Sequence, residues 1–242
     1  MKAKKTSGWI IIDNEITKST NDDALNFALP ESGSKRFIFS AKKQTGGRGR
    51  LGRKWQNGEG NLMFSAIVPC DNENSGILAL VCGICVLETI KCFAPQAEIK
   101  LKWPNDILLE DKKVCGILLE RKDEKYMVAG IGVNIKNAPI LKNSLYQAAS
   151  LQNCGIFVTR EDFLAKFLEI FNEWLEKIAR KELVTIKETW IKNAKGINKK
   201  IEIENIKGKI TGKLIGVDDN GALILEESGN TVTILTGDVH YL

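Results

Sequence analysis

The residues best suited to chemistry lie in one short segment, residues 44–55. Between Gln44 and Trp55, this segment carries glycines and cations: Gly46, Gly47, Arg48, Gly49, Arg50, Gly52, Arg53 and Lys54. Glycines let the backbone approach a ligand closely and expose N–H groups to phosphate oxygens, and guanidinium groups match the planar geometry of phosphates and carboxylates. Trp55 offers a flat face on which an adenine could stack. The segment therefore predicts a loop that binds an anionic ligand.

Other interpretations of this segment stay open. It could be a solvated basic loop, or a Gly–Arg segment that contacts RNA, because Gly–Arg runs alone are weak signals. It is not a Walker A loop, since the Gly-Lys-Ser/Thr ending is absent.

A second polar cluster follows the alternating segment 98–103. The alternation places Ile99, Leu101 and Trp103 on one face of a strand and the lysines, including Lys102, on the other. Pro104 ends the strand because it cannot donate to a sheet. The lysine, amide and carboxylate groups of Lys102, Asn105 and Asp106 suit a nucleotide bound with Mg²⁺. A hairpin turn with surface charges is the alternative.

A third candidate lies on the next predicted hairpin, where Lys113 precedes Gly116. A glycine within a strand indicates a bulge or a close approach by a ligand. From this hairpin, the Lys113 ammonium could reach a bound carboxylate or phosphate. An exposed hairpin lysine is the alternative.

Helices and strands that could position these residues are predicted from hydrophobic periodicity. We expect strands at 9–12, 36–41, 62–68, 98–103, 107–109, 114–120 and 126–135, and helices at 20–28, 77–93, 160–180 and 182–193. Thr20 with Asp23, and Thr159 with Asp162, resemble helix caps. After Gly196, short alternating runs at 201–206, 209–217, 222–225 and 231–235 predict a small antiparallel barrel. We place the domain boundary near Lys195, giving domains 1–194 and 195–242.

Composition limits the class of protein. The chain has 242 residues, 43% of them hydrophobic, and a net charge of +5, which is too mild to indicate a nucleic-acid-binding protein. No charge-free apolar run reaches the length of a membrane span, and no signal peptide is evident. Six cysteines without a regular framework predict reduced thiols and a cytoplasmic protein. Cys82 and Cys85 could suggest a metal or redox site, but they lie in an apolar helix, so we interpret them as buried thiols.

Taken together, these segments resemble the catalytic domain of biotin–protein ligases. The matching segments, in chain order, are 19–21, 44–55, 102–106, 113–120 and 130–135. The resemblance implies an α+β fold, with a mixed sheet and helices mainly on one face, related to class II aminoacyl-tRNA synthetases, plus a C-terminal SH3-like β-barrel.

The resemblance also implies a role for each matching residue. Biotin would be bound by Ser19, Thr20, Asn21, Gln44, Gly47, Arg48, Gly49, Arg50, Lys113 and Gly116. ATP and the adenylate would be bound by Arg50, Arg53, Trp55, Lys102, Asn105 and Asn134. The catalytic residues would be Arg48, Arg50 and Lys113, which supply positive charge at the reacting carboxylate and phosphate. Asp106 would help to hold Mg²⁺.

The implied activity is ATP-dependent formation of biotinyl-5′-AMP and transfer of biotin to a lysine of a biotin carboxyl carrier protein. Some members carry an N-terminal helix-turn-helix and repress transcription. We expect no DNA binding here, because the first predicted strand already begins at Trp9. Lipoate–protein ligases are the nearest rival, and a nucleic-acid-binding module is a rival of another class; an inactive scaffold is a third alternative. We expect no membrane partner, and an exposed edge strand would allow a homodimer.

Overall fold

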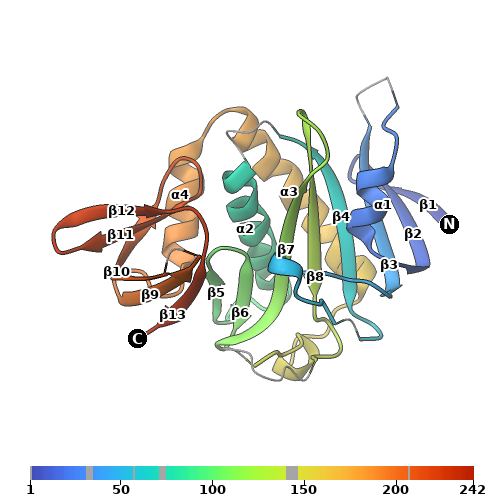
Figure 1. The fold of residues 1–242 in the computed structure, drawn as a ribbon. Helices are drawn as coiled ribbons and strands as arrows, with labels where there is room; N and C mark the ends of the chain where they lie inside the picture. The colour runs from blue at the N-terminus through green and yellow to red at the C-terminus, as the bar shows by residue number, and fades with distance from the viewer. Residues whose placement is uncertain (1, 31–34, 57, 71–74, 140–146, 207) are drawn as a thin grey trace.

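A mixed sheet forms the centre of the molecule. The computed structural model describes residues 2–30, 35–56, 58–70, 75–139, 147–206 and 208–242. The sheet has eight strands in the order β1-β2-β3-β4-β8-β7-β6-β5 (Figure 1). They are β1 (Lys2–Thr6), β2 (Trp9–Thr17), β3 (Arg36–Gln44), β4 (Leu62–Pro69), β5 (Ile99–Lys102), β6 (Asp106–Leu109), β7 (Lys112–Arg121) and β8 (Tyr126–Val133). The β2–β3 pair is parallel and the other neighbours are antiparallel, which confirms the predicted mixed sheet.

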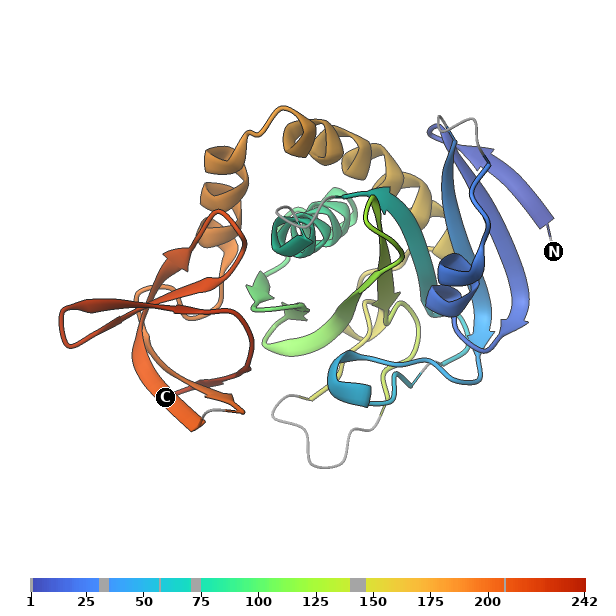
Figure 2. The ribbon, with the colours of Figure 1, turned by 45° about the horizontal axis from the view of Figure 1, so that its top comes forward.

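The helices cover the two faces of this sheet unequally (Figure 2). They are α1 (Thr20–Asn26), α2 (Ser75–Phe93), α3 (Arg160–Ala179) and α4 (Leu183–Asn193), and two short 3₁₀ turns occur at Arg50–Gly52 and Gln152–Cys154. The three long helices share one buried cluster with Ile11 and Ile38. Helix α1 packs instead against Ile12 and Phe37. Because successive strand residues point to opposite faces, α1 lies alone on the second face, and the predicted one-sided arrangement is confirmed.

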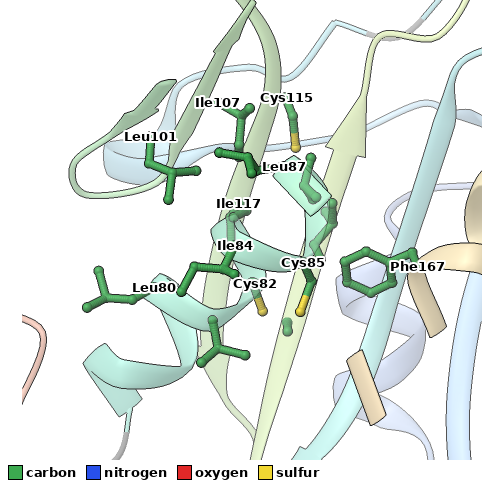
Figure 3. Packing of buried hydrophobic residues seen from close by; sticks show 14 of the residues in the cluster. Leu80, Cys82, Ile84, Cys85, Leu87, Leu101, Ile107, Cys115, Ile117 and Phe167 are labelled. Atoms are coloured by element: carbon green, nitrogen blue, oxygen red, sulfur yellow. The ribbon is translucent and has the colours of Figure 1, made fainter. Parts of the chain in front are cut away.

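Helix α2 is the core helix of the molecule. Its side chains pack between strand residues such as Leu101 and Ile117 on one side and Phe167 of α3 on the other (Figure 3). By length and hydropathy α2 alone among the described helices could cross a membrane, but 67% of its most apolar 18-residue stretch is buried within the protein. A helix that is apolar around most of its circumference is what such a buried position requires.

The C-terminal strands form a second sheet with the order β12-β11-β10-β9-β13. They are β9 (Lys200–Asn205), β10 (Gly208–Val217), β11 (Leu223–Glu227), β12 (Asn230–Ile234) and β13 (Asp238–Tyr241), and every neighbouring pair is antiparallel. Within the described residues β12 and β13 are edges that no ladder joins, so the sheet is not a closed barrel. This sheet is fixed to the central one: Trp103 Nε1 donates to the Gly221 carbonyl oxygen over 3.1 Å.

Three local predictions need correction. The first strand begins at Lys2 rather than at Trp9, since β1 pairs with β2 through residues that carry little hydrophobic pattern. The predicted Thr20–Asp23 cap is wrong: Ser19 is the N-cap, and Asp23 accepts hydrogen bonds from Thr17 and Asn14 instead. Strand β13 was not predicted. The Thr159 cap is confirmed, because Thr159 Oγ1 accepts from the Asp162 N–H over 3.0 Å.

Candidate active site

A cavity of about 520 Å³ lies between the segment 44–55, strands β7 and β8, and the C-terminal sheet. Its size falls within the range of about 300–1,000 Å³ that small-molecule sites occupy. All of the predicted site residues except Gly47 line it: Ser19, Thr20, Asn21, Gln44, Arg48, Gly49, Arg50, Arg53, Trp55, Lys102, Asn105, Asp106, Lys113, Gly116 and Asn134. Segments far apart in the sequence therefore meet at one place, as the sequence predicted.

Gly47 is not part of the cavity wall and allows the loop to fold closely. A Cβ atom at Gly47 would lie 2.9 Å from Gln44 Nε2 and 3.1 Å from the Trp55 carbonyl oxygen, closer than side chains normally pack. The Trp55 N–H donates to the Gly47 carbonyl oxygen over 2.9 Å. A side chain at this position would separate the two ends of the loop.

One end of the cavity is a buried network of neutral hydrogen-bonding groups. The Thr20 N–H and the Thr20 hydroxyl both donate to Gln44 Oε1, over 2.8 and 3.1 Å. The Ser65 hydroxyl lies 2.8 Å from Thr20 Oγ1 and 2.5 Å from Asn21 Oδ1. Because buried amides and hydroxyls are costly to leave unpaired, this network fixes the side chains that face the cavity. Ser65 was missed by the sequence analysis, since a lone serine in a hydrophobic strand carries no signal.

Arg48 fastens the first part of the loop to the core of the protein. Its guanidinium lies 2.7 Å from Asp22 of α1 and 2.9 Å from Glu120 of β7. Burial alone would lower the Arg48 pKa, but the hydrogen bonds that its guanidinium donates to Asp22 and Glu120 raise it. Glu120 also accepts from Asn21 Nδ2 over 2.6 Å, so it joins the loop to the neutral network. Asp22 and Glu120 were not predicted as site residues, although Glu120 belongs to a matching segment.

In the second part of the loop, the side chains of Arg50 and Arg53 contact residues outside the loop. Arg50 Nη1 lies 3.4 Å from Asn105 Oδ1, and Arg50 Nη2 donates to Thr236 Oγ1 over 3.1 Å. Arg53 forms an ion pair with Asp238 of β13. Burial lowers the Arg50 pKa, against the opposing field of Asp238. The loop is thus in contact with Asn105 in the segment 102–106. Thr236 and Asp238 come from the C-terminal sheet, and neither was predicted as a site residue.

Glycines in the sheet form the floor of the cavity. A Cβ atom at Gly132 would lie 2.5 Å from the Trp55 ring, and one at Gly116 would lie 2.9 Å from it. A Cβ atom at Gly130 would lie 2.0 Å from Asn21 Oδ1. Asn21 and Trp55 therefore lie directly on the strands, a close approach that only glycine permits. At Gly116 the group that approaches the strand closely is the Trp55 indole, and the predicted approach of a ligand to this glycine stays a prediction.

Positive charge collects at the other end of the cavity. Lys102 is only 7% exposed, and this burial lowers its pKa, against the field of Asp106. Lys113 Nζ lies 2.6 Å from Asp106 Oδ1 and 5.8 Å from the centre of the Trp55 ring. With Arg50 and Arg53 nearby, the four cations outnumber the two carboxylates of Asp106 and Asp238, and the excess charge favours an anionic ligand.

Asn134, which lines this cavity, holds a buried and unsatisfied acceptor. Its Nδ2 donates to the Ala149 carbonyl oxygen over 3.1 Å, whereas its buried Oδ1 has no hydrogen-bond partner among the described residues. Buried acceptors without partners are rare in proteins. The position suits a ligand that brings an N–H or O–H donor.

The acidic residues here fit a magnesium ion that arrives with a nucleotide. Mg²⁺ typically binds one or two carboxylates together with substrate phosphates and water. Asp106 provides one carboxylate beside the phosphate-binding cations. No group of three His, Cys, Asp or Glu side chains that could hold a metal exists within the described residues. A dedicated metal cage is therefore absent from this part of the chain.

Three cysteines near the cavity floor and in α2, namely Cys82, Cys85 and Cys115, are fully buried and unsuited to act as reactive groups. Within the described residues none of the six forms a disulfide bond, and burial raises the pKa of the Cys82, Cys85 and Cys115 thiols. Thiols with raised pKa values are poor nucleophiles and metal ligands. The interpretation of Cys82 and Cys85 as buried structural thiols is confirmed.

Fold and cavity together define a ligand-binding enzyme site of a known class. The model of the biotin/lipoate A/B protein ligase family matches residues 13–135, and the model of the biotin protein ligase C-terminal domain matches residues 196–240. The chain belongs to the biotin/lipoate A/B protein ligase family.

Individual relatives are more specific. The chain is 30% identical to the biotin–[acetyl-CoA-carboxylase] ligase of Paracoccus denitrificans, over 93% of this chain and 98% of that protein. It is 28% identical to the bifunctional ligase/repressor BirA of Bacillus subtilis, over 96% of this chain and 74% of that protein. The structure of the Aquifex aeolicus biotin protein ligase in complex with biotin and ATP matches with a TM-score of 0.83 and 30% identity, covering 95% of this chain and 97% of that one. These similarities favour the biotin branch of the family over the lipoate branch.

Proposed function

We propose that this protein is a biotin protein ligase, which activates biotin with ATP and transfers it to a lysine of a biotin carboxyl carrier protein. The observation that carries the proposal is the meeting of the basic loop with the 102–106 corner in one cavity, where Arg50 Nη1 lies 3.4 Å from Asn105 Oδ1. A loop placed far from that corner would have left no site for an adenylate.

The two ends of the cavity suit the two ends of biotin. The ureido ring is neutral and needs paired donors and acceptors, which Ser19, Thr20, Asn21 and Gln44 provide at the buried end. The carboxylate would then lie toward the cationic end, near Lys113. The nucleotide would then contact Asn105, Asn134 and Trp55. It would donate a hydrogen bond to Asn134 Oδ1, which has no partner within the described residues.

In the first half-reaction, a biotin carboxylate oxygen attacks the α-phosphorus of ATP, and the bond from that phosphorus to the pyrophosphate oxygen breaks. The products are biotinyl-5′-AMP and pyrophosphate. Such a reaction depends on in-line positioning and on stabilising the developing charge. Lys102, Lys113 and Arg50 would supply that charge. Mg²⁺, held by Asp106 and the phosphates, would neutralise the triphosphate.

In the second half-reaction, the neutral ε-amine of a carrier lysine attacks the acyl carbon of the adenylate. The amide bond forms as the bond to the phosphate oxygen breaks, AMP leaves, and the amine nitrogen gives up one proton to solvent. The mixed anhydride is sensitive to water, so the cavity must exclude water until the carrier arrives. Arg48, Gly49, Arg50 and Arg53 would cover it, because Arg48 holds the loop to α1 and β7.

We further propose that residues 1–194 form a catalytic domain related to class II aminoacyl-tRNA synthetases and that residues 195–242 are an SH3-like domain whose barrel is open. Six cysteines with no disulfide bond in the part of the chain that the structure describes fit a reducing compartment such as the cytoplasm. We expect no operator binding by this chain, since a net charge of +5 is too mild to indicate a nucleic-acid-binding protein.

The test is incubation of the purified protein with biotin, ATP, Mg²⁺ and a biotin carboxyl carrier protein, with mass spectrometry of the carrier. We expect the mass to increase by one biotinyl group only when all components are present. Parallel reactions with lipoate should leave the carrier or a lipoyl domain unmodified. Strong, salt-dependent binding to RNA or DNA, without any carrier modification, would instead support a nucleic-acid-binding module.

A further inference from the structure

The C-terminal sheet holds the basic loop through two side chains, Thr236 and Asp238. We propose that these two residues are positioning residues for the ligation reaction: they keep Arg50 and Arg53 over the cavity and so retain the adenylate. The inference rests on the proposed function, because it assigns the proposed site a contribution from the C-terminal sheet.

The contacts are specific in geometry. Arg53 donates to both carboxylate oxygens of Asp238, with Nη1 3.4 Å from Oδ1. Arg50 bridges two elements, since one of its nitrogens donates to Thr236 Oγ1 over 3.1 Å and the other faces Asn105 Oδ1. Arg50 is therefore held between the C-terminal sheet and the corner where the nucleotide would bind.

The tip of the loop needs contacts with the C-terminal sheet because few contacts within the loop itself hold the tip in place. The turn Arg50–Gly52 buries no residue, and Leu51 is 77% exposed with a positive φ of 56°. The backbone bonds nearby, Gly49 N to Arg53 O at 2.7 Å and Arg53 N to Arg50 O at 3.2 Å, are internal to the loop. They shape the turn without fixing its position over the cavity.

The C-terminal sheet can supply a fixed reference point. Its core residues Ile203 and Val239 belong to the same buried cluster as α2, and the bond from Trp103 to the Gly221 carbonyl ties it to the strand that ends at the nucleotide corner. A Cβ atom at Gly237 would lie 2.5 Å from Ile203 Cγ2, so the glycine before Asp238 lets β13 pack tightly on β9. A rigid sheet therefore presents Asp238 at a defined place.

Charge supports the same interpretation. Burial alone would raise the Asp238 pKa, but the hydrogen bond and charge of Arg53 lower it, with smaller contributions from Arg50 and Lys102. Asp238 also lines the cavity. It is thus an anion at the rim of a cationic site, where it orients the arginines instead of binding the anionic ligand.

The experiment compares wild type with Asp238→Asn and Thr236→Val, using biotinyl-5′-AMP that the enzyme forms from biotin and ATP. We measure the rate at which the adenylate escapes into solution, and kcat and KM for ATP. A pair this exposed contributes modestly, so escape should rise about threefold to fivefold in each variant. KM for ATP should rise while the biotin affinity stays near the wild-type value, a division that general destabilisation would not produce.

Asp219→Asn is the matched control, because Asp219 also joins the C-terminal sheet to the rest of the protein, through an ion pair with Lys187 of α4, but lies outside the cavity. It should release the adenylate at the wild-type rate. Adding Asp238→Asn to an Arg53→Gln protein should produce no further increase, since the partner is already lost.

The outcomes separate the two proposals. A wild-type enzyme that forms no adenylate refutes the proposed function itself. A wild-type enzyme that forms and retains it, with Asp238→Asn and Thr236→Val retaining it equally well, refutes the positioning role. Thermal unfolding of each variant shows whether it is folded, and an unfolded Asp238→Asn leaves Thr236→Val to decide the question.

Discussion

Substitution of Gly130 by alanine tests whether the close contact between α1 and the sheet builds the site. The new Cβ atom would lie 2.0 Å from Asn21 Oδ1, whereas an ordinary contact begins at 3.4 Å. The Asn21 side chain would therefore have to withdraw by 1.4 Å, which is the difference between those two distances. We expect the variant to lose both stability and affinity for biotin.

The magnitude follows from what holds Asn21 in place. Its side chain accepts from Ser65 over 2.5 Å and donates to Glu120 over 2.6 Å, and a shift of this size breaks both bonds. Overpacking of a core costs about 1–3 kcal/mol, and a buried polar group that loses its partner costs about 1–3 kcal/mol. Since partial relaxation reduces their sum, the free energy of unfolding should fall by about 2–4 kcal/mol.

Urea unfolding and biotin titration measure the two effects. For a slope of about 2–3 kcal/mol per M, the urea midpoint should fall by about 1 M. Biotin affinity should fall by about tenfold or more, because each 1.4 kcal/mol at a site is a factor of ten. Gly83→Ala in α2 is the control: its Cβ would lie 3.5 Å from Leu101 Cδ2, an ordinary contact. It should raise stability by up to about 1 kcal/mol, since alanine favours a helix.

An unchanged urea midpoint together with unchanged biotin affinity in Gly130→Ala would refute the reasoning, because the contact of Asn21 with the strand would then contribute neither to stability nor to biotin binding. Loss of affinity with no loss of stability would show that Asn21 moves freely within the network but still contacts the ligand.

Three further predictions concern the cationic end of the cavity. Lys113→Ala should slow biotin-dependent exchange of pyrophosphate into ATP by at least about tenfold, because a charge beside the reacting groups is lost; Lys112→Ala, an exposed neighbour on β7, should not, and equal exchange in both variants would remove Lys113 from the mechanism. Burial lowers the Lys102 pKa, so its charge disappears at a lower pH than that of an ordinary lysine, and affinity for ATP should decline in that alkaline range. At pH values between the lowered Lys102 pKa of the folded protein and the ordinary lysine pKa, Lys102 is protonated in the unfolded chain but not in the folded one. The contribution of Lys102 to stability therefore rises with pH in this interval. A Lys102→Met protein whose stability depends on pH in the same way as that of the wild type would contradict this. Asn134→Leu should raise KM for ATP by about tenfold, and it should lower the free energy of unfolding by about 1–3 kcal/mol because the buried Ala149 carbonyl oxygen loses its hydrogen bond from Asn134 Nδ2; an unchanged KM would show that the nucleotide does not use Asn134.

The sequence was informative where periodicity and local chemistry agree. Strict alternation in 98–103 correctly placed Leu101 in the core and Lys102 toward the cavity. Residue types alone indicated that the glycine- and arginine-rich loop could bind an anion, but they did not exclude a solvated basic loop or an RNA-contacting segment. Strand β1 escaped detection, since its lysine-rich sequence resembles a solvated terminus and its pairing with β2 is set by the tertiary structure.

Partner choice could not be read from the sequence. Arg48 was predicted to face the ligand, yet Asp22 and Glu120 both bind its guanidinium, and they lie far from it along the chain. The Thr20–Asp23 pattern fits a helix cap locally, but Gln44 competes for the Thr20 N–H from another strand. Asp238 follows an ordinary turn, and only the packing of two sheets brings it to the loop. Contacts between residues far apart in the sequence determine which partner each of these side chains binds, and local sequence patterns do not encode such contacts.

The two edges of the central sheet differ in how readily they could pair with a strand of another copy of the protein. At β5 the chain itself covers the edge, since the Lys195 N–H donates to the Leu101 carbonyl oxygen over 2.8 Å. The other edge is β1, with the sequence Lys-Ala-Lys-Lys-Thr. Two molecules that joined their sheets there would bring like charges together, and edge lysines are a common protection against such aggregation. Crowded solutions of this protein should therefore resist open-ended stacking at low ionic strength and lose some of that resistance as salt screens the lysines.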